Sequence, residues 1–161
     1  MGHFNIIKYC NRPFKTLEEM NNTLIDNWNK TVSPEDTVYL LGDFLFKRGT
    51  PQMTPTTLNG NITLIRGNHD RGISDTQFKT MYGIKEVYAQ PLVIYEQGYE
   101  IVLMHAPRQL HTNRINLCGH VHQAWESRNG FYNVGVDIHN FTPISIDYIL
   151  DKIKKGGIIT V

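Results

Sequence analysis

The sequence of 161 residues predicts a single-domain α/β protein, and three observations support this fold class. Four short apolar segments have the length of buried strands, and each of them stops at a cluster of polar residues. Segments with apolar residues at helical spacing lie before, between and after these strands. The length suits one domain with a substantial core, and no repeat, low-complexity tract or Pro/Gly-rich linker divides the chain.

The first half of the chain alternates helix and strand. Thr16-Leu17-Glu18-Glu19 fits a capping box, and apolar residues follow it at helical spacing. The segment 44–58 has no strand pattern, so we expect a loop there, with one short helix near 55–58. The expected elements are a turn at 11–13, a helix over 16–31, strands over 37–41 and 61–66, and a short helix over 75–81.

The second half is richer in strands. Gln97-Gly98 predicts a hairpin turn, and Gly156-Gly157 predicts the end of the last helix. The expected elements are strands over 85–89, 92–95, 100–104, 115–118 and 131–136, a helix over 145–155, and an edge strand over 158–161.

Composition and charge exclude several classes of protein. The formal net charge of +1 gives no general electrostatic basis for binding nucleic acid or an anionic membrane. No apolar run approaches the roughly 20 residues of a membrane span, and no signal-peptide pattern opens the chain. Cys10 and Cys118 form no CxxC motif, so we expect two reduced, buried thiols in a cytoplasmic protein.

Side chains that can bind metal follow four of the predicted strands. They are Asp43, Asn68 with His69, His105, and His120 with His122. Taken singly, each has an ordinary structural role, such as a turn aspartate or a half-buried histidine. Open α/β sheets, however, place their sites at the carboxyl ends of strands, and a His-x-His pair on an extended segment points to one side. Together these residues favour a metal site.

The residue types indicate which metal and which chemistry. Histidines with a carboxylate and an amide oxygen suit Mn, Fe, Zn, Co or Ni, whereas calcium prefers a shell of oxygens. Cys118 has no thiolate partner nearby in the sequence, which argues against a structural zinc site. The order His69-Asp70 suggests a histidine that a carboxylate orients and that can protonate a leaving oxygen.

These motifs resemble the calcineurin-like metallophosphoesterase family in order and spacing. The resemblance runs from Met1 to the final helix, and the segment 133–137 with Pro143-x-Ser145 is similar to its small single-domain branch of phage and bacteria. The motifs that carry it are Gly42-Asp43, Gly67-Asn68-His69-Asp70, His105 and Gly119-His120-Val121-His122.

The resemblance implies an α/β/β/α sandwich of two mixed sheets flanked by helices, with two divalent ions (Mn, Fe, Zn or Ni) at the strand ends. Asp43 would bridge both ions, and His122 would serve the second ion. Asn68, His105 and His120 would complete the first site. A metal-bound hydroxide would attack the phosphate ester in line, and His69 would act as the general acid.

The family's first motif, Asp-x-His, has no counterpart in this sequence. Met1 falls where relatives have an internal residue, so we expect residues 1–161 to be one N-terminally truncated domain that lacks the first strand. His122 and Asp43 alone would then hold the second ion weakly. Phe46 also departs from the family, since many members have an acidic residue there.

A few further residues have two interpretations. Arg12 and His3 neighbour motif segments and can contact a substrate phosphate, although a solvated arginine and a frayed terminus are the alternatives. Trp125 is either a pocket wall or a loop packing residue. His111 and His139 belong to no motif, so we expect them on the surface or in loops.

The sequence therefore favours a metal-dependent phosphoesterase with a phosphate-ester substrate. Phosphodiesters or small phosphate esters fit a chain of this length better than phosphoproteins do. One alternative is a non-catalytic relative that binds one metal or none and serves as an interaction module. Another is a truncated reading frame without a stable fold.

Overall fold

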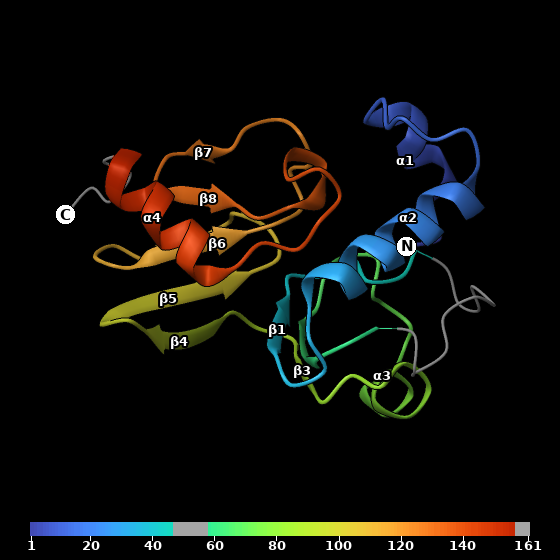
Figure 1. The fold of residues 1–161 in the computed structure, drawn as a ribbon. Helices are drawn as coiled ribbons and strands as arrows, with labels where there is room; N and C mark the ends of the chain where they lie inside the picture. The colour runs from blue at the N-terminus through green and yellow to red at the C-terminus, as the bar shows by residue number, and fades with distance from the viewer. Residues whose placement is uncertain (47–57, 157–161) are drawn as a thin grey trace.

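The computed structural model describes residues 1–46 and 58–156 and contains two β-sheets with helices packed against them (Figure 1). The first sheet is parallel and has the order β1-β2-β3; its strands are β1 (Thr37–Leu40), β2 (Asn61–Ile65) and β3 (Glu86–Tyr88). The second sheet is mixed and has the order β4-β5-β6-β8-β7; its strands are β4 (Leu92–Glu96), β5 (Tyr99–Met104), β6 (Ile115–Cys118), β7 (Ser127–Arg128) and β8 (Phe131–Asn133). The α/β class is confirmed, but only one of the two sheets is mixed in the described residues.

Side-chain caps set where the helices begin. Thr16 Oγ1 accepts the Glu19 N–H at the start of α2, and α3 opens with a complete capping box between Ser74 and Gln77. The helices are α1 (Phe4–Tyr9), α2 (Leu17–Thr31), α3 (Asp75–Tyr82) and α4 (Ile146–Gly156), with one 3₁₀ turn, η1 (Val136–Ile138). The expected helices over 16–31, 75–81 and 145–155 are thus confirmed to within one residue at each end.

Three local features differ from the sequence expectation. No element was expected at 1–10, where α1 forms with His3 Nδ1 accepting the Ile6 N–H. The strand expected over 131–136 ends at Asn133, because the Asn133 side chain accepts the Gly135 N–H and turns the chain into η1. The edge strand expected at 158–161 and most of the short helix expected near 55–58 lie outside the described residues.

Two apolar clusters join helices to sheets. Ile62 and Leu64 on one face of the first sheet pack against Trp28 of α2 and Phe78 of α3. The second cluster unites the other face of the first sheet, one face of the second sheet and α4; its buried members include Leu41, Ile65, Ile101, Leu103, Leu117, Tyr132, Ile149, Leu150 and Ile153. Helices therefore cover both sheets, but α4 lies on the face of the second sheet that also receives Leu41 and Ile65, not on the opposite face as a strict four-layer order requires (Figure 1).

The opposite face of the second sheet carries a smaller cluster. Val102, Met104, Cys118 and Phe131 lie there, and Trp125 packs against them from the segment that follows β6. Trp125 is therefore a loop packing residue.

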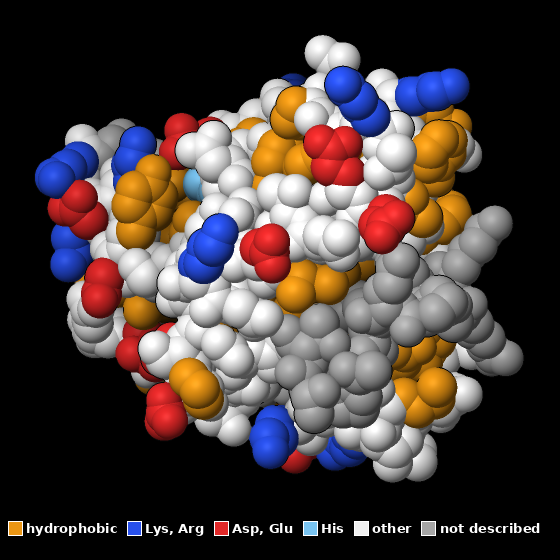
Figure 2. Space-filling model, turned by 45° about the vertical axis from the view of Figure 1, so that its right-hand side comes forward, with side chains coloured by type: hydrophobic (Ala, Val, Ile, Leu, Met, Phe, Trp, Pro, Cys, Tyr) orange, Lys and Arg blue, Asp and Glu red, His pale blue; other side chains and the backbone are white. Residues whose placement is uncertain are grey.

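Acidic and basic side chains are mixed over the face in Figure 2, and its hydrophobic side chains form separate groups. No helix of the described residues has the length and apolar character needed to cross a bilayer.

The two thiols should not react while the protein is folded. Cys10 and Cys118 are free and buried, and burial raises the pKa of Cys118 to about 12. The pKa of Cys10 is also raised, first by burial and then by the charge of Asp137. Because the thiolate is the reactive form, an aromatic disulfide reagent at neutral pH should label neither thiol until denaturant is added. Rapid labelling of the native protein would contradict this burial.

Candidate metal centre

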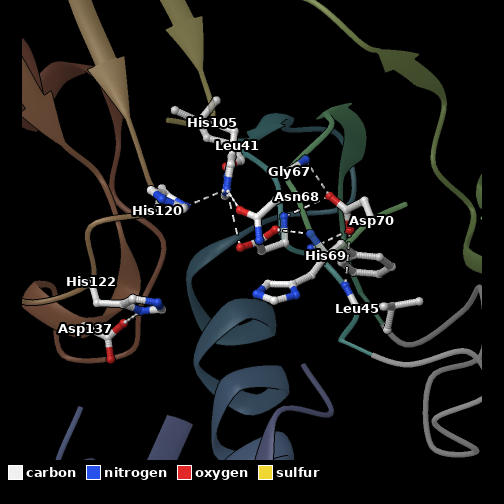
Figure 3. Close-up of polar contacts among 12 residues, drawn as sticks. Leu41, Leu45, Gly67, Asn68, His69, Asp70, His105, His120, His122 and Asp137 are labelled. Carbon is white, nitrogen blue, oxygen red and sulfur yellow. Dashed lines mark hydrogen bonds and ion pairs between the residues drawn. The ribbon is translucent and has the colours of Figure 1, made fainter. Parts of the chain in front are cut away.

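Four strands bring their carboxyl ends to one region of the molecule. β1 and β2 are parallel neighbours with Leu40 opposite Leu64, and β5 and β6 are parallel neighbours with Met104 opposite Cys118. Of the residues that follow these strands, Asn68, His105 and His120 converge in the close-up (Figure 3), and Asp43 lies beside them with Oδ2 3.4 Å from His105 Nε2. The four strand ends thus lie together, and metal binding by their side chains stays a prediction.

His105 is the centre of this group. Its Nδ1 lies 2.8 Å from the carbonyl oxygen of Leu41. A carbonyl oxygen can only accept a hydrogen bond, so Nδ1 carries the proton and Nε2 presents a lone pair. Nε2 in turn lies 2.9 Å from Asn68 Oδ1, 3.1 Å from His120 Nδ1 and 3.4 Å from Asp43 Oδ2.

In this arrangement several atoms that can bind a metal ion lie close to one another. The lone pair of His105 faces the amide oxygen of Asn68, and the carboxylate of Asp43 lies beside both. A proton or a metal ion between them makes such a contact favourable, and His120 Nδ1 can donate to the same lone pair. The ligand atoms of Asp43, His105 and His120 are all within 4.8 Å of one another. Two imidazoles, a carboxylate and an amide oxygen fit a borderline divalent ion such as Mn, Fe, Zn or Ni.

Two glycines let the loops of the centre approach each other. A Cβ on Gly67 would lie 2.2 Å from Asp43 Oδ1 and 2.4 Å from the Asp43 amide nitrogen. Gly42 has a φ of +81°, and a Cβ there would lie 2.5 Å from His105 Nδ1. The glycine of each motif is therefore required by the close contact of the β1 and β2 loops.

Asp70 has a different role from the one expected. Its side chain is fully buried, and Oδ2 accepts the N–H groups of Asp43 and Gly67, both at 2.8 Å. Oδ1 accepts the Phe44 N–H at 2.9 Å and that of Leu45 at 3.4 Å. These bonds use the carboxylate to fasten the loop after β1 to the loop after β2 (Figure 3). The expectation that Asp70 orients the His69 ring is wrong, because its hydrogen bonds go to backbone amides.

His69 lies beside the centre and is fixed through its backbone. The His69 N–H donates to Asp43 Oδ1 at 2.9 Å, while its side chain is exposed. Its ring stands edge-on to His3, with centroids 5.6 Å apart, and 4.9 Å from the ring of Phe46. Burial, followed by the charge of His69, lowers the pKa of His3. His3 thus lies next to the expected general acid, and its contact with a substrate stays a prediction.

The two histidines of the His-x-His motif have different partners. His120 and His122 have φ values of 68° and 48°, so both are in the left-handed region and not on an extended strand. His120 packs edge-on against His105, and its pKa is lowered by burial and by His105 in that order. His122 Nδ1 lies 2.9 Å from Asp137 Oδ2. His120 thus joins the group of Asp43 and His105, whereas His122 falls outside that group.

Arg12 does not face the centre as a substrate contact. Its Nε lies 2.7 Å from Asp137 Oδ1 and its Nη2 2.9 Å from Oδ2, and the two side chains are 8% and 3% exposed. Burial would raise the pKa of Asp137, but hydrogen bonds from His122 and Arg12 outweigh burial and lower it. The substrate role expected for Arg12 is therefore replaced by a buried ion pair.

Sequence reasoning missed Asp137 and Cys10 as neighbours of His122. Ligand atoms of Cys10, His122 and Asp137 lie within 4.8 Å of one another, which makes a second possible metal group. Arg12 already binds both oxygens of Asp137, and that favours a hydrogen-bonded chain over a bound ion. His139, expected on the surface or in a loop, follows η1 but is buried, with Nε2 3.1 Å from the Asn133 carbonyl oxygen.

Comparisons with known proteins show the family of this chain. The model of the calcineurin-like phosphoesterase superfamily domain matches residues 20–140. The uncharacterized protein MJ1445 of Methanocaldococcus jannaschii is 37% identical, over 98% of this chain and 89% of that protein. The crystal structure of AQ665 from Aquifex aeolicus, a protein of unknown function, superposes with a TM-score of 0.71 at 26% identity and covers 94% of each chain. The chain therefore belongs to the calcineurin-like phosphoesterase superfamily.

Proposed function

We propose that this chain is a metal-dependent phosphoesterase that hydrolyses phosphodiesters or small phosphate esters. The observation that carries the proposal is the convergence of Asp43, Asn68, His105 and His120, with His105 Nε2 2.9 Å from Asn68 Oδ1, 3.1 Å from His120 Nδ1 and 3.4 Å from Asp43 Oδ2. Two imidazoles, a carboxylate and an amide oxygen this close together are a ligand set that suits a borderline divalent ion. Membership of the superfamily supplies the class of reaction.

The four converging residues would hold the metal ion. A divalent ion bound there would polarise the phosphoryl oxygens and lower the pKa of a water molecule. The Leu41 carbonyl keeps the proton of His105 on Nδ1, so Nε2 stays available as a ligand. The buried Asp70 carboxylate holds the Asp43 and Gly67 amides in place, which fixes the separation of the two ligand loops.

His69 is the proposed general acid. Its exposed ring lies next to the ligand loop, because its own amide donates to Asp43. A proton on the ring can pass to the leaving oxygen of an ester held by the centre. The rings of His3 and Phe46 border His69 and restrict where its ring can turn.

Hydrolysis of a chromogenic phosphodiester tests this function. We expect turnover that requires added Mn²⁺ and that falls to the level of the buffer in Asp43→Ala. The matched control is His111→Ala, because His111 bonds to the Asn116 side chain through its backbone N–H and carbonyl oxygen, which alanine keeps. Absence of turnover in a folded wild-type protein that binds Mn²⁺ would overturn the proposal and favour an interaction module.

One specific observation favours a single tightly bound ion. Asp43 groups with His105 and His120, whereas His122 lies in the separate group with Asp137. Titration of the metal-free protein with Mn²⁺ in a calorimeter should therefore give one tight site per chain, which Asp43→Ala removes. Two tight sites of similar affinity would contradict this stoichiometry and support the dinuclear centre of the family.

A further inference from the structure

A chain of buried polar contacts connects three distant segments beside the metal centre. Arg12 lies just after α1, Asp137 is in η1, and His122 follows β6. The Arg12 guanidinium binds both oxygens of Asp137, and Oδ2 also lies 2.9 Å from His122 Nδ1. The side chains of Asp137 and Arg12 are only 3% and 8% exposed, whereas that of His122 is 41% exposed.

The contacts fix which nitrogen of His122 carries the proton. An ionised carboxylate can only accept hydrogen bonds, so the proton must be on Nδ1. In the neutral ring, Nε2 of His122 then presents its lone pair. The Leu41 carbonyl has the same effect on His105, because it holds a proton on Nδ1 of that ring. Arg12 donates two hydrogen bonds to the Asp137 carboxylate, and this bidentate contact fixes the plane of the carboxylate. The fixed carboxylate in turn fixes the direction of its hydrogen bond with His122.

The backbone of His122 is held as firmly as its ring. The fully buried Asn133 donates from Nδ2 to the His122 carbonyl at 2.7 Å and to the Trp125 carbonyl at 2.9 Å. This keeps His122 at a φ of 48°, a conformation that side chains other than glycine seldom adopt. In Figure 3 the ring extends from its loop toward the middle of the group of side chains, with Asp137 beneath it.

We propose that Asp137, held by Arg12, is a positioning residue that keeps His122 in the Nδ1–H tautomer and so presents Nε2 toward the metal centre. The inference rests on the proposed function for the use that the protein makes of His122. The contacts among Arg12, Asp137 and His122 can be tested without a bound metal ion. Arg12 also has a role in this proposal. Its guanidinium orients the Asp137 carboxylate, and that carboxylate orients His122.

Nitrogen–proton correlation spectra of the metal-free protein test the tautomer directly. At about pH 8, where histidine side chains are neutral, His122 of the wild type should show the pattern of a single Nδ1–H tautomer. Asp137→Asn should give a mixture, because the NH₂ group that replaces one carboxylate oxygen cannot accept from Arg12 or His122, and the neutral amide oxygen is a weaker acceptor for the Nδ1 proton than a carboxylate is. A His122→Gln variant identifies the signals of His122.

His139 is the internal control for these spectra. It lies two residues from Asp137, and its ring is held by the Asn133 carbonyl and not by Asp137. If Asp137 only stabilises the loop, Asp137→Asn will disturb His139 and His122 alike, and the positioning role is overturned. A mixture at His122 with His139 unchanged supports it. An Nε2–H tautomer at His122 in the wild type would also overturn it.

The same variant should change the response to metal. Partners behind a histidine ligand typically change metal affinity by about 10- to 100-fold, and here the affected ion would be the weaker one that His122 serves, not the tight ion of Asp43, His105 and His120. The Mn²⁺ concentration for half-maximal activity should therefore rise by about that factor in Asp137→Asn and in Arg12→Gln, with Asp151→Asn as the exposed carboxylate control. An unchanged Mn²⁺ requirement in an active enzyme overturns the inference but leaves the proposed function intact. A cobalt–thiolate absorption band that Cys10→Ser removes would also overturn it, because Cys10, His122 and Asp137 would then bind an ion.

Discussion

Asp70→Asn is expected to lower the free energy of unfolding by about 3 kcal/mol or more. The buried carboxylate accepts four backbone N–H groups, those of Asp43, Phe44, Leu45 and Gly67. Asparagine keeps the shape but turns one acceptor oxygen into an NH₂ donor that opposes amide donors. Buried donors left without a partner cost about 1–3 kcal/mol each, so the loss is large compared with a typical stability of about 5–15 kcal/mol.

Urea unfolding followed by circular dichroism measures this loss. Asp151→Asn is the matched control, because Asp151 is exposed and pairs with Lys155 on the surface of α4; its effect should stay within about 0.5 kcal/mol. Asp70→Asn should also weaken Mn²⁺ binding, since Asp70 joins the two loops that carry the ligands. An equal effect of the two substitutions would mean that the Asp70 hydrogen bonds contribute little.

The fold and the ligand group could be predicted because they rest on local patterns. Each apolar strand is short and stops at a polar cluster, and parallel pairing then brings the carboxyl ends together. Asp43, Asn68, His105 and His120 were found in this way. The first helix, α1, was not found, because its six residues are too few to show helical spacing and it begins at a histidine cap.

The partners of charged residues could not be predicted, because they depend on contacts between distant segments. Arg12 and Asp137 are 125 residues apart, and nothing in either local sequence indicates the pair. Asp70 directly follows His69, yet its carboxylate turns toward the loop of Asp43 and away from its neighbour in sequence. The left-handed backbone of His120 and His122 was missed for a related reason, since it is set by the fold around them.

Gly42→Ala is expected to destabilise the protein and to disrupt the metal centre, and Gly98→Ala is an unusually close control. Both glycines have a φ of +81°, so alanine pays the same backbone cost of about 1–2 kcal/mol at each position. A Cβ at Gly98 meets nothing within 4 Å, whereas at Gly42 it would lie 2.5 Å from His105 Nδ1 and 2.6 Å from the Gly67 nitrogen.

The difference between the two alanine variants therefore isolates the steric contact inside the centre. Overpacking of this kind costs about 1–3 kcal/mol, so Gly42→Ala should exceed Gly98→Ala by that amount in urea unfolding. The added methyl group also pushes His105 away from the Leu41 carbonyl that fixes its tautomer, so Gly42→Ala should lose Mn²⁺ binding while Gly98→Ala keeps it. Equal stability and equal Mn²⁺ binding in the two variants would show that the loops of Gly42 and Gly67 can separate without harm to the site, and the close approach would then have no part in holding the metal.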